Sequence, residues 1–490
     1  MAKSMPSAYR HTLVLSGLLL LAGTAAILWQ GVLFAAVIAL AGFLWLLSHR
    51  LDLGWYVLVF LAPMMHWTIR LDHYPYLFRG FPSLLQVYAP VVEFWTVGLI
   101  IAWMIAKLRA WRQKGTVHIA APGWRWYGLF VLSAAVSLFS LGPGFSSGVW
   151  YIGRFLIFVY AGYVVLGADI IENKKILERS LVAFAASGAV AAIMGVASLV
   201  CGAWRDVYGI VRVTPFALGG WAPFGDQHIF LAEAILATLP SAGYLWHLRY
   251  RDKDSRQWLS ALIAVMIAVA LLTLSRAGWI ALAVEAAVAA HFAGGKKMWR
   301  YYLGRVWPLA LAVLPILFYF VYFLSGSDIV RGSNATRWSL TQISWMYFQE
   351  HPLIGTGIGS FVPLVADTWY FTLEFGDPVD AHGIVQKIGT EQGILGLVTF
   401  ALFVWLLLRR VYLRATDLSY DDSARAAAVF GLALMCGSLT FQLFNTQYYS
   451  SVMWVPLALA LAAQSVHRRD TRVVGFLAPP LARARLVADV

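Results

Sequence analysis

The chain has 490 residues, of which 60% are hydrophobic and only 12% are charged, whereas soluble domains carry about a quarter charged residues. This composition excludes an ordinary soluble protein and indicates a chain that crosses a membrane many times. The formal net charge of +13 does not indicate nucleic-acid binding, because the lysines and arginines gather in short loops between apolar runs. The two cysteines predict neither a disulfide framework nor a metal site.

Fourteen apolar runs follow one another along the chain, each near the ~17–25 residues that cross a bilayer as a helix. They cover residues 12–28, 32–47, 53–69, 83–106, 126–140, 149–168, 180–200, 228–248, 258–274, 277–293, 306–324, 388–408, 426–443 and 451–465. The first run follows Lys3 and Arg10 without a clear cleavage site, so we interpret it as a retained helix. The runs at 126–140 and 451–465 are short. We therefore predict an all-α polytopic membrane protein with about 12–14 transmembrane helices.

Most of the 37 lysines and arginines fall on one side of this predicted topology. By the positive-inside rule, both termini are then cytoplasmic, and the basic loops contact membrane lipids. The expected parts are transmembrane helices within 1–324, which include an outer loop at 201–227; a large outer loop at 325–387; further transmembrane helices at 388–465; and a cytoplasmic tail at 466–490.

The large outer loop is too aromatic for a disordered tether. Its apolar residues recur at helical spacing from Ala335 to Glu350, which predicts a helix lying on the membrane surface. The run from His351 to Phe361 has three glycines at alternate positions but lacks the lysine of a nucleotide loop. We interpret it as a tight turn that packs closely against its neighbours.

Basic residues are scarce on the predicted outer side, so each one is informative. Arg212 lies in the 201–227 loop, Arg276 in a turn between two runs, and Arg337 in the large loop. A guanidinium group binds phosphate through two parallel hydrogen bonds, so these arginines are candidates for holding a pyrophosphate. Arg154 lies just inside a run, where it can bind substrate, meet lipid headgroups, or pair with a carboxylate such as Glu233.

His382 lies at the mouth of the run that begins at 388. An imidazole with a pKa near ~6.5 can take a proton from a sugar hydroxyl near neutral pH. Asp380 is two residues away and Glu391 lies on the following helix, so either carboxylate can orient the imidazole. A solvated histidine at the membrane interface is the alternative interpretation. Aromatic side chains of the large loop, such as Trp338, can stack on sugar rings or anchor the protein at the interface.

Several of these segments resemble, in order, the signature of the O-antigen ligase and polymerase superfamily. The resemblance covers roughly residues 205–405 and departs from the family at Gly383, where Asn is common. The segments that carry it are Arg212 before Gly225-Asp226-Gln227-His228, Ser275-Arg276-Ala277-Gly278, Arg337-Trp338, His351-Pro352-Leu353-Ile354-Gly355-Thr356-Gly357, Ala381-His382, and Thr390-Glu391-Gln392-Gly393-Ile394-Leu395-Gly396-Leu397.

The resemblance implies a GT-C-like, metal-independent and inverting glycosyltransferase of the bacterial inner membrane, without a cofactor. Such an enzyme takes a glycan from undecaprenyl pyrophosphate and passes it to an acceptor sugar on the periplasmic face. The acceptor is a growing glycan or a lipid A-core, and a chain-length regulator is a possible partner. The expected catalytic residues are His382, Arg276 and Arg212. The expected substrate-binding residues are Arg337, Arg154, Trp338 and Glu391.

The alternative function is a lipid-linked oligosaccharide flippase or another secondary transporter. Glu93, Glu233 and Glu285 lie within apolar runs, where a carboxylate is costly unless it pairs with another group or lines a polar cavity. Transporters place such groups near the bilayer midplane, between paired broken helices. Here the candidate arginines lie at the predicted outer edge, and the sequence shows no clear internal repeat, so we prefer the enzyme.

Overall fold

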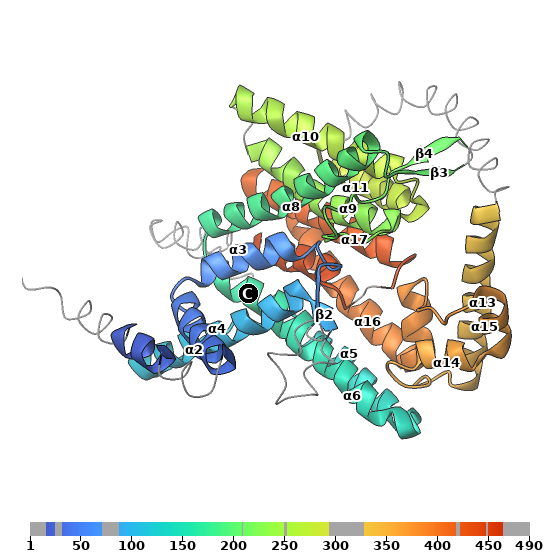
Figure 1. Ribbon diagram of the computed structural model, residues 1–490, viewed down its shortest axis with the longest axis horizontal. Coiled ribbons are helices and arrows are strands. Elements are labelled where there is room, and N and C mark those ends of the chain that lie inside the picture. The colour runs from blue at the N-terminus through green and yellow to red at the C-terminus, as the bar shows by residue number, and fades with distance from the viewer. Residues whose placement is uncertain are drawn as a thin grey trace, which may run out of the picture.

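The computed structural model describes residues 16–24, 32–70, 88–207, 209–248, 252–293, 328–417, 422–446 and 449–463. These residues are almost entirely helical (Figure 1), and two short antiparallel hairpins are the only sheets among them. The prediction of an all-α protein is thereby confirmed. The apolar run predicted at 306–324, most of the loop at 70–82 and the tail at 466–490 lie outside the described residues.

The first half of the described chain is built from apolar helices with few breaks. Its helices are α2 (Val32–Leu47), α3 (Leu51–Leu61), α4 (Val91–Lys114), α5 (Trp124–Ser137), α6 (Phe145–Arg154), α7 (Leu166–Ile170) and α8 (Lys174–Val200). A π-helix, Phe155–Val165, joins α6 to α7, and two 3-10 turns, Leu138–Ser140 and Gly142–Gly144, join α5 to α6. Strands β1 (Thr68–Arg70) and β2 (Tyr88–Pro90) form the first hairpin.

The second half carries the longest helices. They are α9 (His228–Leu248), α10 (Lys253–Leu272), α11 (Arg276–Ala293), α13 (Asp328–Glu350), α14 (Phe361–Asp367), α15 (Trp369–Phe375), α16 (Ile384–Thr416) and α17 (Asp422–Gln442), followed by a last helix, Ser451–Ala463. Strands β3 (Arg205–Val207) and β4 (Ile210–Arg212) form the second hairpin, in which Arg205 is the register partner of Arg212.

Seven helices of the described residues are long and apolar enough to cross a membrane, or up to eight if one bent pair is a single span. This count covers the described residues alone, so the run predicted at 306–324 lies outside it, and it treats two of the predicted runs as one bent pair. The pair Val37–Leu47 and Leu51–Leu61 is bent by 106°, so two predicted runs form one broken span or a re-entrant loop. The Arg109 guanidinium lies at this bend and donates hydrogen bonds to the carbonyl and hydroxyl oxygens of Ser48.

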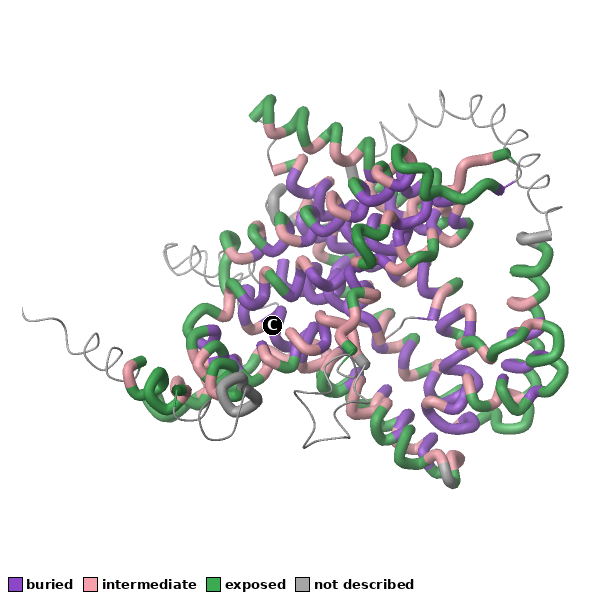
Figure 2. Tube along the Cα trace, viewed as in Figure 1, coloured by how far each residue is buried: buried purple, intermediate pink, exposed green. Residues whose placement is uncertain are grey.

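The main core lies between α8, α9, α17 and the last helix, where Figure 2 shows buried residues concentrated. Small residues let these helices approach closely, as is common within membranes. A Cβ at Gly188 on α8 would lie 2.1 Å from the Thr238 hydroxyl oxygen on α9. A Cβ at Gly437 on α17 would lie 2.0 Å from a carboxylate oxygen of Glu285 on α11. The bundle is therefore fixed by close backbone packing.

The predicted helix at 335–350 is confirmed as part of α13. This helix packs with α14 and α15 around a second, smaller core outside the main bundle (Figure 1), formed by Leu340, Ile343, Phe361, Val365, Phe371 and Ala381. Ala381 belongs to the segment that precedes α16, so this small core also fixes the chain next to His382.

The glycine run at 351–361 forms a tight turn against α16, as its sequence indicated. Gly355, Gly357 and Gly359 all have positive φ angles, of 71°, 107° and 82°. A Cβ at Gly355 would lie 2.4 Å from the backbone nitrogen of Gln392. This close approach occurs where α16 is interrupted at Gly393, which has φ 64° and ψ −159°. The glycines therefore serve packing, which confirms the structural interpretation of this run.

Candidate functional site

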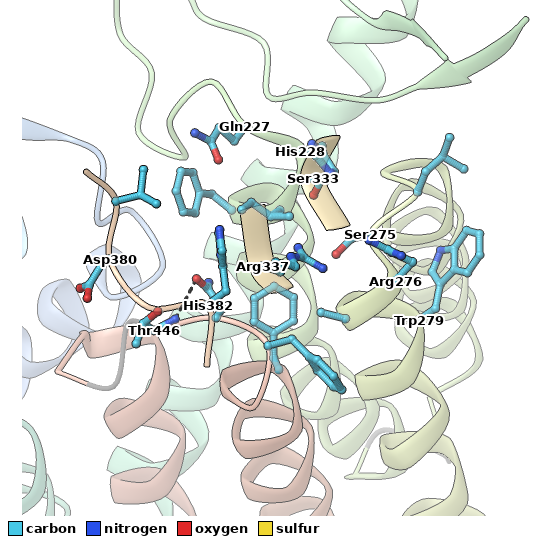
Figure 3. Close-up of a pocket in the computed structure, with 18 of the residues that line it drawn as sticks. Gln227, His228, Ser275, Arg276, Trp279, Ser333, Arg337, Asp380, His382 and Thr446 are labelled. Atoms are coloured by element: carbon cyan, nitrogen blue, oxygen red, sulfur yellow. Dashed lines mark hydrogen bonds between the residues drawn. The ribbon is translucent and has the colours of Figure 1, made fainter. Parts of the chain in front are cut away.

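A cavity of about 430 Å³ lies where β4, α9, α11, α13, the segment before α16 and the end of α17 meet (Figure 3). It is lined by Arg212, Arg276, Arg337 and His382, four residues that the sequence singled out in separate segments. Figure 3 shows His382, Arg337 and Arg276 in a row across the cavity. The structure therefore brings all three expected catalytic residues and one expected substrate-binding residue to one site.

Arg276 is held in place by the turn that begins α11. The Ser275 hydroxyl accepts a hydrogen bond from the backbone N–H of Gly278, which caps the helix N-terminus. The guanidinium Nη2 of Arg276 donates a hydrogen bond of 2.8 Å to the side-chain oxygen of Asn334 on α13. Arg276 thus stands at the positive end of a helix dipole and is tied across the cavity to a second helix.

The other two arginines are crowded by like charge. Burial, and then the positive charges of Arg205 and Arg276, lower the pKa of Arg212. Burial, and then Arg276, lower the pKa of Arg337. An arginine stays protonated at neutral pH in any case, so these shifts report unfavourable electrostatics rather than loss of charge. The Nε atoms of Arg212 and Arg337 are buried and find no hydrogen-bond partner among the described residues. The cavity thus suits an anion with several acceptor oxygens.

His382 is poised as a neutral base. Burial and the neighbouring Arg337 lower its pKa, and Asp380 opposes them with a smaller effect. The imidazole is therefore unprotonated at neutral pH and can accept a proton. The Asp380 carboxylate lies at the edge of the cavity in Figure 3 and binds the ammonium of Lys387, at 2.7 Å from Oδ1. No hydrogen bond between His382 and either Asp380 or Glu391 occurs in the structure.

Three expected substrate-binding residues do not line this cavity. Glu391 is fully buried and accepts a hydrogen bond of 3.2 Å from the backbone N–H of Phe361. Trp338 is 65% exposed and does not line the cavity that its neighbour Arg337 lines. Arg154 forms an ion pair with Glu93, not with Glu233 as the sequence had allowed, and stacks over Tyr449.

The β3–β4 hairpin carries two arginines, and only one of them belongs to the site. Arg205 and Arg212 face each other across the β3–β4 hairpin, but only Arg212 lines the cavity, and Arg205 is exposed.

Several cavity residues were not singled out individually from the sequence. Their shared signal is a polar residue next to the end of an apolar run. They are Gln227, His228, Asn445, Thr446 and Tyr449. Asn445 is held by the buried carboxylate of Glu233, which also accepts a hydrogen bond of 2.5 Å from Gln442. Among the described residues, no group of three or more His, Cys, Asp or Glu side chains gathers as a metal site would require.

Comparison with known protein families places this site in context. A family model described as O-antigen ligase matches residues 261–401, a range that contains Arg276, Arg337 and His382 but not Arg212. No curated protein matches the chain. The family consists of glycosyltransferase-like membrane enzymes, which agrees with the apolar helices and with the resemblance of the sequence motifs. The chain is therefore a multi-pass membrane protein in which residues 261–401 match the O-antigen ligase family, and this match supports the resemblance seen in the sequence motifs.

Proposed function

We propose that the cavity binds the pyrophosphate of an undecaprenyl-linked glycan and that the protein transfers this glycan to an acceptor hydroxyl. The observation that carries the proposal is the convergence of Arg212, Arg276 and Arg337 on one cavity that His382 also lines. Among the side chains lining the cavity, Asp380 is the only carboxylate, and Lys387 neutralises it, so the net field is positive. A pyrophosphate carries negative charge and several acceptor oxygens, which complement these three guanidinium groups.

The proposed reaction is a single displacement at the anomeric carbon. His382 removes the proton of the acceptor hydroxyl as its oxygen forms a bond to the anomeric carbon. The bond between that carbon and the pyrophosphate oxygen breaks, and undecaprenyl pyrophosphate leaves with the bonding electrons. The three guanidinium groups stabilise the negative charge that develops on the leaving oxygen. Attack opposite the leaving group inverts the anomeric configuration. Every step uses side chains that line the cavity.

The proposed location is the periplasmic face of the bacterial inner membrane, with both termini in the cytoplasm. The distribution of lysine and arginine over short loops supports this orientation. The acceptor in the proposal is either a growing glycan or a lipid A-core sugar, so the protein acts as a polymerase or a ligase. A polymerase would work beside a chain-length regulator.

Transfer by the purified protein in lipid nanodiscs tests the proposal. With an undecaprenyl-pyrophosphate-linked glycan and a candidate acceptor, the wild type should release undecaprenyl pyrophosphate and form an extended product. His382→Ala, Arg276→Ala and Arg212→Ala should each fold and lose transfer. His351→Ala and Arg112→Ala are matched controls, because both residues are exposed and lie outside the cavity lining, so both variants should keep transfer.

Normal transfer by all three cavity variants would refute the proposal. A liposome assay addresses the transporter alternative, since it measures movement of the lipid-linked donor between leaflets without an acceptor. Donor movement by the wild type without any transfer would favour the flippase.

A further inference from the structure

A buried lysine lies directly beneath the segment that carries His382. The side chain of Lys387, on the first turn of α16, is 1% exposed. Its ammonium contacts Asp380 at 2.7 and 2.5 Å and lies 3.9 Å from a carboxylate oxygen of Glu391. The rings of Tyr151 and Tyr449 cover it at 5.9 and 5.8 Å.

Folding alone does not call for a lysine at this position. Burying an ammonium group costs several kcal/mol even when it is paired, and an apolar side chain of similar size commonly gives equal or greater stability (gains of about 1–4 kcal/mol). An ionisable residue at the edge of a membrane span therefore commonly has a functional role. The contacts of Lys387 with the segment before α16 indicate that role.

Lys387 holds the chain on both sides of His382. Its backbone N–H donates a hydrogen bond of 3.1 Å to the carbonyl of Gly383, and its ammonium binds the side chain of Asp380. Between these two attachments, Asp380 also accepts a hydrogen bond of 2.9 Å from the N–H of Ala381. His382 lies between these two attachments, and its side chain lines the cavity (Figure 3).

Glu391 extends the same network to the glycine turn. Its carboxylate lies beside Lys387 and accepts the N–H of Phe361, the first residue of α14. The buried ammonium therefore joins three segments: the start of α16, the segment that bears His382 and the end of the glycine turn. This explains why Glu391 is buried and does not reach the substrate cavity.

We propose that Lys387 is a positioning residue that acts on His382 through Asp380, an inference that rests on the proposed role of His382 as the base. The ammonium fixes the segment from Asp380 to Gly383, so the imidazole of His382 meets the acceptor hydroxyl in one orientation. It also neutralises Asp380, so the carboxylate does not weaken the positive field that holds the pyrophosphate. A misplacement of ~1 Å at such a site can cost ~100-fold in rate.

The electrostatic part of this role predicts opposite shifts in two variants. The charged and titratable groups that line the cavity with His382 are Arg337 from α13, Arg276 from α11, Arg212 from β4, His228 from α9, Tyr449 beyond α17, and Asp380 from its own segment. Lys387→Met leaves Asp380 without its cation, so the carboxylate should raise the pKa of His382. Asp380→Asn removes the negative charge and should lower that pKa further. A lysine that does not act through Asp380 would leave the pKa of His382 unchanged in Lys387→Met, whereas Asp380→Asn calibrates the effect of the carboxylate itself.

The test follows the His382 titration without relying on activity. The full-length protein in nanodiscs is treated with diethyl pyrocarbonate across a pH series, and mass spectrometry quantifies modification at His382. We expect the titration midpoint to move to higher pH in Lys387→Met and to lower pH in Asp380→Asn. Lys175→Met, at an exposed position on α8, is the control and should leave the midpoint unchanged. An unchanged midpoint in Lys387→Met would overturn the proposal, and Lys387→Gln, which also removes the positive charge, is measured in the same way if Lys387→Met does not fold.

Transfer kinetics give the second readout. We expect kcat to fall about 10- to 100-fold in Lys387→Met, while the affinity for undecaprenyl pyrophosphate changes less. The double variant, Lys387→Met with Asp380→Asn, should have a kcat no lower than that of the slower single variant. Equal additive losses from two independent residues would contradict the proposed chain of action. Shifted midpoints in a protein whose wild type transfers no glycan would refute the proposed function while leaving the positioning role in place.

Discussion

Replacing Arg337 with alanine should weaken donor binding and at the same time stabilise the empty protein. The two effects have one cause, which is the crowding of positive charge around the cavity. Arg276 and burial both disfavour the charged form of Arg337, and its Nε has no partner among the described residues. The empty site therefore holds an unfavourable charge that only an anionic ligand compensates.

The size of each effect follows from the contacts that Arg337 can make. A hydrogen bond to a charged group contributes about 1.5–3 kcal/mol, and a guanidinium offers two in parallel. Because Arg212 and Arg276 still hold the pyrophosphate, we expect a loss of about 2–4 kcal/mol, or about 30- to 1,000-fold in affinity. Relief of the repulsion should stabilise the empty protein by about 0.5–2 kcal/mol, the usual gain when a functional strain is removed.

Calorimetry with undecaprenyl pyrophosphate and thermal unfolding of the empty protein measure the two effects. Arg337→Lys separates charge from geometry, since lysine keeps the positive charge but cannot form the paired hydrogen bonds. It should lose affinity without gaining stability. Arg112→Ala is the control at an exposed arginine outside the cavity lining. Donor affinity in Arg337→Ala equal to that of the control, or a lower unfolding temperature than the wild type, would refute this reasoning.

Further predictions concern the base, a tether, a turn and an ion pair. Because the pKa of His382 is lowered, its neutral form persists below the usual 6.5, so transfer should stay near its maximum down to about pH 6.5 and fall at lower pH. The contribution of His382 to the free energy of unfolding should also decline as the pH falls below about 6.5, because the unfolded chain binds the proton first. Asn334→Ala removes the hydrogen bond to Arg276 and should weaken donor binding about 5- to 10-fold, by about 1 kcal/mol, without lowering the unfolding temperature. Gly355→Ala should lower the free energy of unfolding by more than about 1 kcal/mol, because the site has a positive φ and a backbone nitrogen 2.4 Å from the new Cβ. Arg154→Ala should destabilise the protein by about 3–5 kcal/mol, since it leaves a buried carboxylate unpaired, but the folded fraction should bind donor normally; weakened donor binding by that fraction would restore a substrate-binding role.

The sequence was sufficient to identify the main candidate residues of the cavity, because these residues lie next to the ends of apolar runs. Arg276 follows one run and His382 precedes another, and the positive-inside rule assigns both to the same face. That rule gives the side of the membrane but not the distances. The meeting of Arg212, Arg276 and His382 depends on how α9, α11 and the end of α17 pack, which hydropathy does not encode.

Partner choice among buried charges could not be predicted. Arg154 had Glu93 and Glu233 as candidate partners in apolar runs, and packing of α4 against the π-helix after α6 selects Glu93. Glu233 instead holds Gln442 and Asn445. Glu391 follows His382 closely enough in sequence to reach it, but the glycine turn covers its side chain. Hydropathy separates the runs at 32–47 and 53–69, but it does not show that the two helices form one bent pair.

The cavity draws its lining from both inside and outside the stretch that the family model matches. Residues 261–401 supply Arg276, Arg337 and His382, while Arg212, His228 and Tyr449 come from flanking regions. A chimera that received residues 261–401 from a relative would therefore combine part of the relative's cavity lining with the remaining lining residues of this chain. Donor chemistry and acceptor preference cannot be transplanted as a cassette, and successful recombinants should need the β3–β4 hairpin and the chain after α17 from the same parent.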